Sequence, residues 1–312
     1  MKLALVSLGI VLSVGACKKS SGGGGGGGSS WLVGESGLMV NVLTSGEQRG
    51  YPLDSRETLN SIACRYNGEA WVAGTRGTLL YTSDAGDSWA SQAVPTSADL
   101  RTLATQDWGP LFVAGDGVFL TSSDTGAHWT AVGDDTISFR AMAAAQRAQT
   151  VLALSEDGAV FAFENQALVP RTTLPGARAV AVSPDGKAAI LVGDRVISRS
   201  SDGGRTWSQP TATDTRLDDV RFNDDGSAIA VGAAGAIAHI SSTGDVVMQQ
   251  VGTADLHTVH LAELDEGDST VGVAAGDGGA VYLTLDGGAT WRAAPSVGRT
   301  VLSGDQIGDG HR

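Results

Sequence analysis

One pattern recurs along most of the 312-residue chain. A short apolar run ends in glycine or another small residue, which we term the anchor, and the anchors follow one another at intervals of 38 to 44 residues. A period of this length is typical of repeat architectures, because one unit cannot bury its apolar face without neighbours. The seven anchors are Gly34, Gly74, Gly115, Ser155, Gly193, Gly232 and Gly276.

Each repeat reads as four short strands separated by turns. In the second repeat, the apolar runs Leu79–Thr82, 89–94 and Leu100–Thr105 alternate with turns, and residues 111–114 open the next repeat. A helical solenoid would need longer stretches with a 3.6-residue period, and 44 glycines disfavour long helices. The sequence therefore predicts an all-β fold, a seven-bladed β-propeller with four antiparallel strands per blade.

The two ends of the repeat region predict how the ring closes. The first repeat begins at its second strand, at Trp31, and lacks an innermost strand. After the outer strand of the last repeat, residues 299–303 match the innermost-strand pattern. We expect this C-terminal strand to complete the first blade, because that pairing removes an exposed sheet edge. The propeller domain is expected to span residues 31–312.

The first residues have the pattern of an export signal. One lysine precedes the apolar run 3–14 and the small residues Gly15 and Ala16, a pattern typical of a secretory signal that is too short to span a bilayer. Residues 17–30 contain seven consecutive glycines flanked by serines, which predicts a flexible linker. The chain is therefore expected to be exported and then to carry its propeller on a linker.

The sequence Val14-Gly15-Ala16-Cys17 resembles the bacterial lipobox. The resemblance implies a lipoprotein signal peptide over residues 1–16 and lipidation of Cys17, which would anchor the protein to a membrane of the bacterial cell envelope. Lys18 stands where aspartate would imply retention at the inner membrane, so the resemblance favours the outer membrane. An ordinary signal peptide with a cysteine near its end is the alternative.

Four repeats share a turn of the form Asp-X-Gly-X-X-Trp. It resembles the Asp-box, or BNR repeat, of sialidase-type propellers, where the motif lies away from the ligand face. An aspartate can accept backbone N–H groups of its own turn, and glycine adopts the left-handed conformation that the turn needs. We expect the motif to be structural, since three repeats have lost parts of it. Its residues are Asp84, Trp89, Asp124, Trp129, Asp202, Trp207, Asp286 and Trp291.

Together, the anchor pattern and the Ser-X-Asp-Gly-Gly-X-Thr-Trp motif resemble the photosystem II assembly and stability factor-like propellers, a family with many relatives in non-photosynthetic bacteria. Residues 183–187, Ser-Pro-Asp-Gly-Lys, are similar to a turn of YVTN-type propellers. These resemblances imply a WD40/YVTN/BNR-like fold. They also imply a non-catalytic protein-binding or assembly scaffold, although one fold hosts many functions.

Composition limits the partners. The net charge of −13 makes nucleic acid an unfavourable partner, because phosphate backbones would be repelled. Two cysteines cannot form a disulfide framework, and Cys64, in the inner strand Leu59–Cys64, is expected to be a buried thiol. We expect a monomer whose partner is another envelope protein or an anionic ligand.

Enzymatic residues are not apparent in the sequence. A sialidase-like protein that binds or hydrolyses glycans is the alternative function, and it would need a tyrosine nucleophile with a carboxylate partner and an arginine cluster. Tyr81 and Tyr282 fall in third strands and Tyr66 at a turn, so only Tyr51 could approach the ligand face. The histidines lack zinc-site spacing. The acidic turns 223–226 and 265–268 fit solvated hairpins better than calcium loops. We therefore expect no catalytic site, metal or cofactor.

One alignment suggests a binding site. When the seven innermost strands are aligned on their apolar residues, one polar position falls near the start of each strand, where it would line the channel mouth. Arginine suits carboxylates, so this ring could hold an acidic tail, a chain terminus or a small anion. Alternatively, its arginines pair with nearby Asp99, Asp134, Asp135 and Asp255, or they point into solvent. The predicted ring is Asn60, Arg101, Arg140, Arg178, Asp218, His257 and Arg299.

Overall fold

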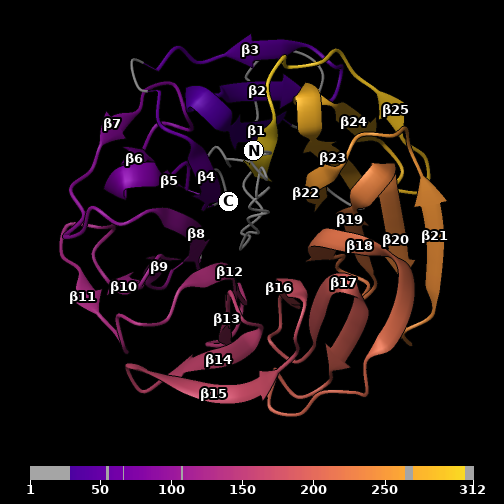
Figure 1. The fold of residues 1–312 in the computed structure, drawn as a ribbon. Coiled ribbons are helices and arrows are strands. Elements are labelled where there is room, and N and C mark those ends of the chain that lie inside the picture. Colours follow the sequence, from indigo (N-terminus) through magenta and orange to yellow (C-terminus); the bar gives the residue numbers. More distant parts are fainter. Residues whose placement is uncertain (1–28, 54–55, 66, 107, 264–269, 306–312) are drawn as a thin grey trace, which may run out of the picture.

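The computed structural model describes residues 29–53, 56–65, 67–106, 108–263 and 270–305. The chain is an all-β propeller, in which sheets are arranged around a central axis (Figure 1). The predicted signal peptide, Cys17 and most of the predicted linker lie outside the described residues, as do Tyr66 and the turn 265–268. Within the described ranges, the structure contains no helix with the length and hydropathy needed to span a membrane.

Five of the sheets formed by the described residues contain four antiparallel strands each. In each, chain order runs from the innermost strand outwards, except that the last strand of the chain is the innermost strand of the first sheet. The first sheet is β26 (Val301–Asp305), β1 (Ser29–Gly34), β2 (Met39–Leu43) and β3 (Gln48–Gly50). The second is β4 (Leu59–Cys64), β5 (Ala70–Gly74), β6 (Leu79–Thr82) and β7 (Ala90–Ser91).

The other three sheets of this kind follow the same plan. The first of them is β8 (Leu100–Thr105), β9 (Leu111–Gly115), β10 (Val118–Ser122) and β11 (Thr130–Ala131). The next is β12 (Phe139–Ala144), β13 (Val151–Ser155), β14 (Ala159–Glu164) and β15 (Ala167–Thr173). The last is β22 (Leu256–Glu263), β23 (Thr270–Gly276), β24 (Val281–Thr284) and β25 (Arg292–Ala293).

The prediction of seven blades is wrong, because the strands form six sheets. The sixth sheet contains both repeats anchored at Gly193 and Gly232. They merge because β17 and β18 are each 12 residues long and pair with one another. Asp194 lies opposite Arg216, and residues 196 and 197 lie opposite residues 212 and 211, so the pairing connects the two repeats. Its strands, in order, are β16 (Ala177–Val182), β17 (Ala189–Ser200), β18 (Thr211–Phe222), β19 (Ala228–Gly232), β20 (Ala236–Ile240) and β21 (Val246–Gln250).

The predicted closure of the ring by the C-terminal strand is confirmed, although the strand covers Val301–Asp305 and not the predicted residues 299–303. β26 pairs antiparallel with β1, and Ser303 lies opposite Val33. The ends of the described propeller therefore meet in one sheet, and β1 has a neighbour on both sides. The strands predicted at Leu79–Thr82 and Leu100–Thr105 are also observed with those bounds.

The core lies between the sheets. The second strand of a sheet is buried along its length, as in β5, whereas an outer strand such as β7 is exposed. Small Ala, Val and Leu side chains fill most of these interfaces, which suits a chain with 5% aromatic residues. Because inner strands of neighbouring sheets share no backbone ladder, side chains join them. In these contacts a backbone N–H donates to Ser61 Oγ, Thr102 Oγ1, Asp219 Oδ2 or Ser303 Oγ.

The inner strands also bury a group of ionisable side chains. Asp219 lies 2.9 Å from Arg221, and burial raises the pKa of the carboxyl to about 6. His260 is fully buried, and its Nδ1 lies 3.3 Å from Asp305. Burial and the nearby Arg221 lower the pKa of His260 to about 3, so the imidazole is neutral at pH 7. Cys64, buried as predicted, donates its backbone N–H to Asp305.

The propeller has two distinct faces. In the third sheet, Leu100 lies opposite Gly115, while Thr105 and Ser122 both lie opposite Leu111. The start of the inner strand and the anchor therefore lie on one face, which we call the anchor face. The turns that contain the four Asp-X-Gly-X-X-Trp motifs lie on the other, which we call the Asp-box face.

A ring of paired charges at the channel mouth

Six of the seven predicted ring residues occupy one structural position. Leu100 pairs with Gly115 and Thr102 with Ala114, so Arg101 is the extra residue of a β-bulge. A bulge re-aims the side chain that it inserts, and here the same bulge recurs near the start of each inner strand concerned. The residues at this position are Asn60, Arg101, Arg140, Arg178, Asp218 and His257.

Arg299 does not share this position. In β26, Val301 lies opposite Gly34 and Ser303 opposite Val33, so Leu302 is the inserted residue. The alignment on apolar residues placed Arg299 three positions too early, because it could not detect where the bulge falls. Arg299 lies outside the strand on the anchor face, where its Nη1 donates to Ser36 O at 2.8 Å.

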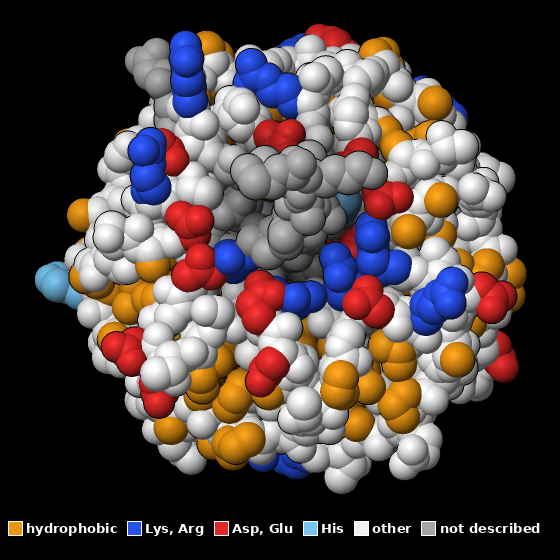
Figure 2. Space-filling model, in the orientation of Figure 1, with side chains coloured by type: hydrophobic (Ala, Val, Ile, Leu, Met, Phe, Trp, Pro, Cys, Tyr) orange, Lys and Arg blue, Asp and Glu red, His pale blue; other side chains and the backbone are white. Residues whose placement is uncertain are grey.

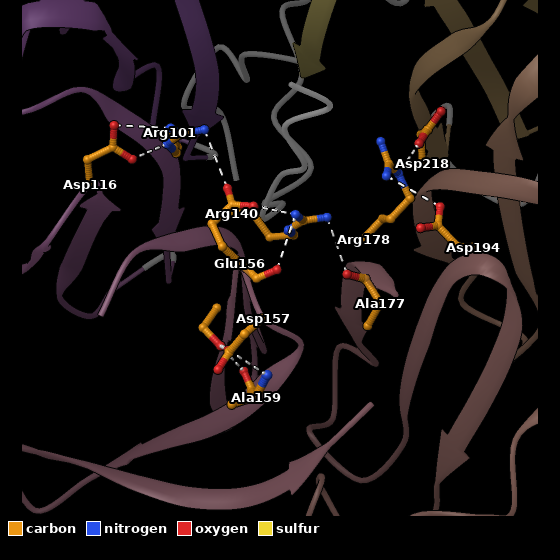
Figure 3. Close-up of polar contacts among 11 residues, drawn as sticks. Arg101, Asp116, Arg140, Glu156, Asp157, Ala159, Ala177, Arg178, Asp194 and Asp218 are labelled. Carbon is orange, nitrogen blue, oxygen red and sulfur yellow. Dashed lines mark hydrogen bonds and ion pairs between the residues drawn. The ribbon is translucent and has the colours of Figure 1, made fainter. Parts of the chain in front are cut away.

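The ring arginines are paired with carboxylates, as Figure 3 shows for Arg101, Arg140 and Arg178. Arg101 donates Nη2 to Asp116 Oδ2 at 3.0 Å and Nε to the other oxygen of the same carboxylate. Its Nη1 lies 3.4 Å from Glu156, whose second oxygen accepts from Arg140. The side chains of Arg101 and Arg140 are only 12% and 14% exposed. Glu156 therefore bridges two largely buried guanidinium groups.

A second group of paired charges continues around the mouth. Arg178 donates Nε to Asp218 at 2.6 Å and also approaches Asp194, as drawn in Figure 3. Arg216, which the sequence alignment missed, joins Asp218 to Asp255 through contacts of 2.9 and 2.6 Å. Burial alone would lower the pKa of Arg216, but these two carboxylates outweigh it and raise that pKa. Arg216 is therefore firmly charged.

His257 completes the described set of paired groups. Its Nε2 lies 2.7 Å from Asp277 Oδ1, and the ring nitrogen Nδ1 lies 3.9 Å from Asp218. Asn60 donates its amide to Leu100 O at 2.8 Å, so it links two neighbouring inner strands. The bulge position thus carries hydrogen-bonded side chains of several kinds, most of them nearly buried.

The ring arginines form ion pairs, as the alternative interpretation of the sequence proposed. Their partners, however, are not the acidic residues that were named in that interpretation. Asp99 accepts the backbone N–H of Arg76, and Asp134 accepts that of Thr136. Asp255 pairs with Arg216. Most of the acidic partners of the ring share a sequence signal that the alignment of inner strands does not include, because they directly follow an anchor. The acidic residues in that position are Glu35, Asp116, Glu156, Asp194 and Asp277.

The mouth is therefore a surface of mixed charge. Figure 2 shows acidic and basic side chains gathered close to one another near the centre of this face. Each guanidinium is held by carboxylates, so its direction is fixed before any partner arrives, which lowers the entropic cost of binding. Among the described residues, no group of three His, Cys, Asp or Glu side chains could hold a metal ion. This geometry suits recognition of a polar surface that carries both signs of charge.

A pocket of about 460 Å³ opens on the anchor face, outside the ring. Arg56 and Arg299 lie on its rim, and Tyr51 and Leu53 contribute to its walls. The Tyr51 hydroxyl accepts the backbone N–H of Trp89 at 3.2 Å. The pocket adds an amphipathic recess to the charged mouth.

The Asp-box face is built differently. Asp202 accepts N–H and O–H of Thr206 at 2.8 and 2.6 Å, and these bonds lower its pKa to about 2. Ser200 donates to the same carboxylate and accepts the N–H of Gly204, whose φ is +84°. The corresponding bonds recur at Asp84, Asp124 and Asp286. These carboxylates are occupied within their own turns.

Comparison with known proteins supports the fold and a distant relationship. A family model described as "DUF6242 beta propeller domain" matches residues 47–174. Two curated proteins named "Photosystem II stability/assembly factor HCF136, chloroplastic" are similar to shorter segments. The protein from Oryza sativa subsp. japonica is 36% identical over 75 residues, and that from Arabidopsis thaliana is 32% identical over 90 residues. The segments are 22% and 27% of this chain, and 18% and 22% of the relatives, so each relative is matched over about a fifth of its length.

Solved structures match over more of the chain. "YCF48 bound to D1 peptide" has a TM-score of 0.60 at 17% identity, covering 86% of this chain and 88% of that one. "YCF48 from Cyanidioschyzon merolae" has a TM-score of 0.62 at 20% identity, with coverage of 80% and 88%. The WD40 β-propeller domain of Doa1 has a TM-score of 0.65 at 14% identity, with coverage of 90% and 91%. At these identities the likeness shows the propeller fold alone.

Proposed function

We propose that this protein is a non-catalytic lipoprotein of the bacterial cell envelope that binds a protein partner through the anchor face and acts as an assembly scaffold. The observation that carries the proposal is the ring of paired charges, in which Arg101, Arg140 and Arg178 are held in place by carboxylates from neighbouring strands. Such a surface is rigid, and its charges are already oriented. It therefore suits recognition of a folded partner or an extended segment.

The comparisons support a scaffold role. Both curated relatives are named as stability or assembly factors. One of the similar structures is described as bound to a D1 peptide, so a propeller of this fold can hold a polypeptide. The Asp-box face has fewer carboxylates available to a polypeptide partner, because the four motif aspartates accept hydrogen bonds from their own turns.

The membrane anchor rests on the sequence. Lipidation of Cys17 would attach the chain to the envelope, and the glycine-rich linker would allow the propeller to reach partners at the membrane surface. Lys18 after the lipidated cysteine supports an outer-membrane location. The acidic body, with a net charge of −13, would be held away from anionic lipid headgroups.

The test is capture of partners from the native envelope by the full-length protein, with a variant of the ring and a matched control. The ring variant combines Arg101→Gln, Arg140→Gln and Arg178→Gln. The control removes the same number of arginines from outer strands, as Arg49→Gln, Arg171→Gln and Arg292→Gln. Circular dichroism and thermal unfolding verify that each variant is folded.

We expect the wild type and the control to recover the same partner, and the ring variant to recover at least about tenfold less, since each charge-assisted contact contributes about 1.5–3 kcal/mol. Equal recovery by the folded ring variant would contradict a role for the mouth. A fluorogenic glycoside assay tests the enzymatic alternative, and turnover by purified protein would contradict the non-catalytic assignment.

A further inference from the structure

A second recess lies at the edge of the sixth sheet, on the Asp-box face. Its volume is about 710 Å³, within the range of about 300–1,000 Å³ that is common for small-molecule sites. It lies between the Asp-box turn after β17 and the turn that joins β20 to β21, which are near one another in Figure 1. We call it the edge groove. Its lining includes Lys187, Arg199, Ser201, Trp207, Gln209 and Thr211.

The edge groove is open because one of its two turns is degenerate. After β17, the full motif runs from Ser200 to Trp207. After β20, the shorter turn 241–245 lacks the tryptophan, so no second indole fills the space. Arg199 reaches across and donates to Ser241 O and Ser242 O at 2.6 and 2.9 Å. These two bonds fix the Arg199 guanidinium between the two turns, where it lines the groove.

The charge of this guanidinium is not neutralised as it is in the ring. Within the described part of the chain, the half-buried Arg199 forms no ion pair with a carboxylate, whereas Arg101, Arg140 and Arg178 all do. Lys187 adds a second cation. It pairs with Asp185 at 3.1 Å, but its side chain is 81% exposed, and exposed pairs are weak. Arg199 and Lys187 therefore bring two cationic groups to one groove of a chain whose net charge is −13.

The remaining groups indicate what kind of anion would fit. Trp207 is half-buried, because it packs against the neighbouring hydrophobic core, and its Nε1 already donates to Gly204 O at 3.1 Å. Only the part of the indole surface that lines the groove is open to a ligand. Ser201, Gln209 and Thr211 are exposed and offer hydroxyl and amide groups to the groove. An aromatic face beside many small polar groups and a fixed guanidinium matches a ligand that has an apolar C–H face, many hydroxyls and an acidic group.

We infer that the edge groove binds an acidic saccharide, with its carboxylate or phosphate on Arg199 and a sugar ring against Trp207. This site is separate from the protein-binding face proposed above, because it lies on the opposite face and shares no residue with the ring. A scaffold with both sites would hold a protein partner on one face and an envelope glycan on the other.

The test is isothermal titration calorimetry on the full-length protein in detergent. The probes are a hyaluronan tetrasaccharide, whose glucuronate residues supply carboxylates, the neutral chitotetraose as a matched sugar, and hexaglutamate as an acidic peptide. Arg199→Gln removes the proposed anchor. Arg205→Gln is the matched control, since Arg205 is exposed in the same turn but bonds to Asp202 O outside the groove lining.

We expect the hyaluronan tetrasaccharide to bind at least about tenfold more tightly than chitotetraose, and Arg199→Gln to weaken it by at least about tenfold, with Arg205→Gln within about twofold of wild type. Trp207→Phe, which keeps a smaller aromatic face, should give an intermediate loss. The inference is overturned if the acidic sugar does not bind at millimolar concentration, if hexaglutamate binds as tightly, or if folded Arg199→Gln binds unchanged. Capture of a protein partner by the anchor face is unaffected by any of these outcomes, so the two proposals fail separately.

Discussion

Glu156 is the residue through which the charged ring can be tested most quantitatively. Its two oxygens serve different guanidinium groups, those of Arg101 and Arg140. Glu156→Gln keeps the shape of the side chain but removes the charge. Arg101 would retain Asp116, whereas Arg140 would lose its carboxylate partner and would keep only contacts to carbonyl oxygens, such as Ala177 O at 3.4 Å.

The expected cost follows from burial. Arg140 is 14% exposed and Glu156 29% exposed, so the pair lies between a surface ion pair and a fully buried one. Removing one partner from a fully buried pair costs about 3–5 kcal/mol, and an exposed pair contributes about 0–1 kcal/mol. We expect Glu156→Gln to lower the free energy of unfolding by about 2 kcal/mol, which corresponds to a fall in Tm of about 4–8 °C.

Equilibrium urea denaturation, followed by tryptophan fluorescence, measures this cost. The matched control is Glu164→Gln, which breaks the pair between Glu164 in β14 and Arg171 in β15, where the side chains are 41% and 16% exposed. The control should lower the free energy of unfolding by about 1 kcal/mol, less than Glu156→Gln, because its carboxylate is more exposed and pairs with one guanidinium instead of two. If Glu156→Gln proves as stable as the wild type, or no less stable than the control, then the ring is not a set of fixed, mutually supporting charges.

Three further predictions test other parts of the account. A methyl group at Gly276 would lie 2.0 Å from the backbone oxygen of Asp255, just before the inner strand β22, so Gly276→Ala should lower the free energy of unfolding by at least about 3 kcal/mol in urea denaturation. Gly50→Ala, with open space around it, should change that free energy by less than about 0.5 kcal/mol. Burial and Arg221 lower the pKa of His260 from 6.5 to about 3. Between these two pH values, His260 is protonated in the unfolded chain and neutral in the folded chain, so lowering the pH favours the unfolded state. The urea concentration at the midpoint of unfolding should therefore decrease as the pH is lowered from 6.5 to 3, and this decrease should be smaller in the His260→Gln variant. Cys17→Ser should move the protein from the membrane fraction to the soluble fraction, and unchanged membrane association on immunoblots would refute lipidation there.

Much of the fold could be predicted because each repeat depends on short-range requirements, such as a glycine where two strands pass closely, that recur in the sequence. The anchor glycine is needed where the second strand passes the start of the inner strand, and a Cβ at Gly115 would lie 1.9 Å from Asp99 O. Such a steric requirement leaves a regular signal in the sequence. The apolar runs between the turns gave strand bounds such as Leu79–Thr82, and the inner-strand pattern near the C-terminus predicted the closure of the first sheet by β26.

The number of sheets could not be predicted in the same way. The repeats anchored at Gly193 and Gly232 are as distinct in sequence as any others, yet their strands merge into one sheet. The merger depends on the pairing of Asp194 with Arg216, which joins two long strands at the mouth. A pairing between residues of adjacent repeats has no signature in the period of either repeat.

The candidate site was predicted in part for a related reason. The bulge position was correct for six strands, but apolar alignment could not show that Leu302, rather than Arg299, is inserted in β26. Acidic partners such as Asp116 and Glu156 were missed because they directly follow the second strand of a sheet, whereas the arginines lie within the inner strand. Only the register of the sheets brings the two positions together.

The central claim, that the anchor face is the surface that binds a partner, can be measured directly by site-specific photo-crosslinking in the native envelope. A photoreactive amino acid would replace Ser36 or Arg195 on the anchor face, and Ala85 or Thr125 in Asp-box turns on the other face. All four residues have a positive φ between 53° and 62°, so they are matched in local backbone conformation. The account predicts a crosslinked protein adduct from the two anchor-face positions and none from the Asp-box face. Adducts confined to the Asp-box face, or absent from both faces, would contradict it.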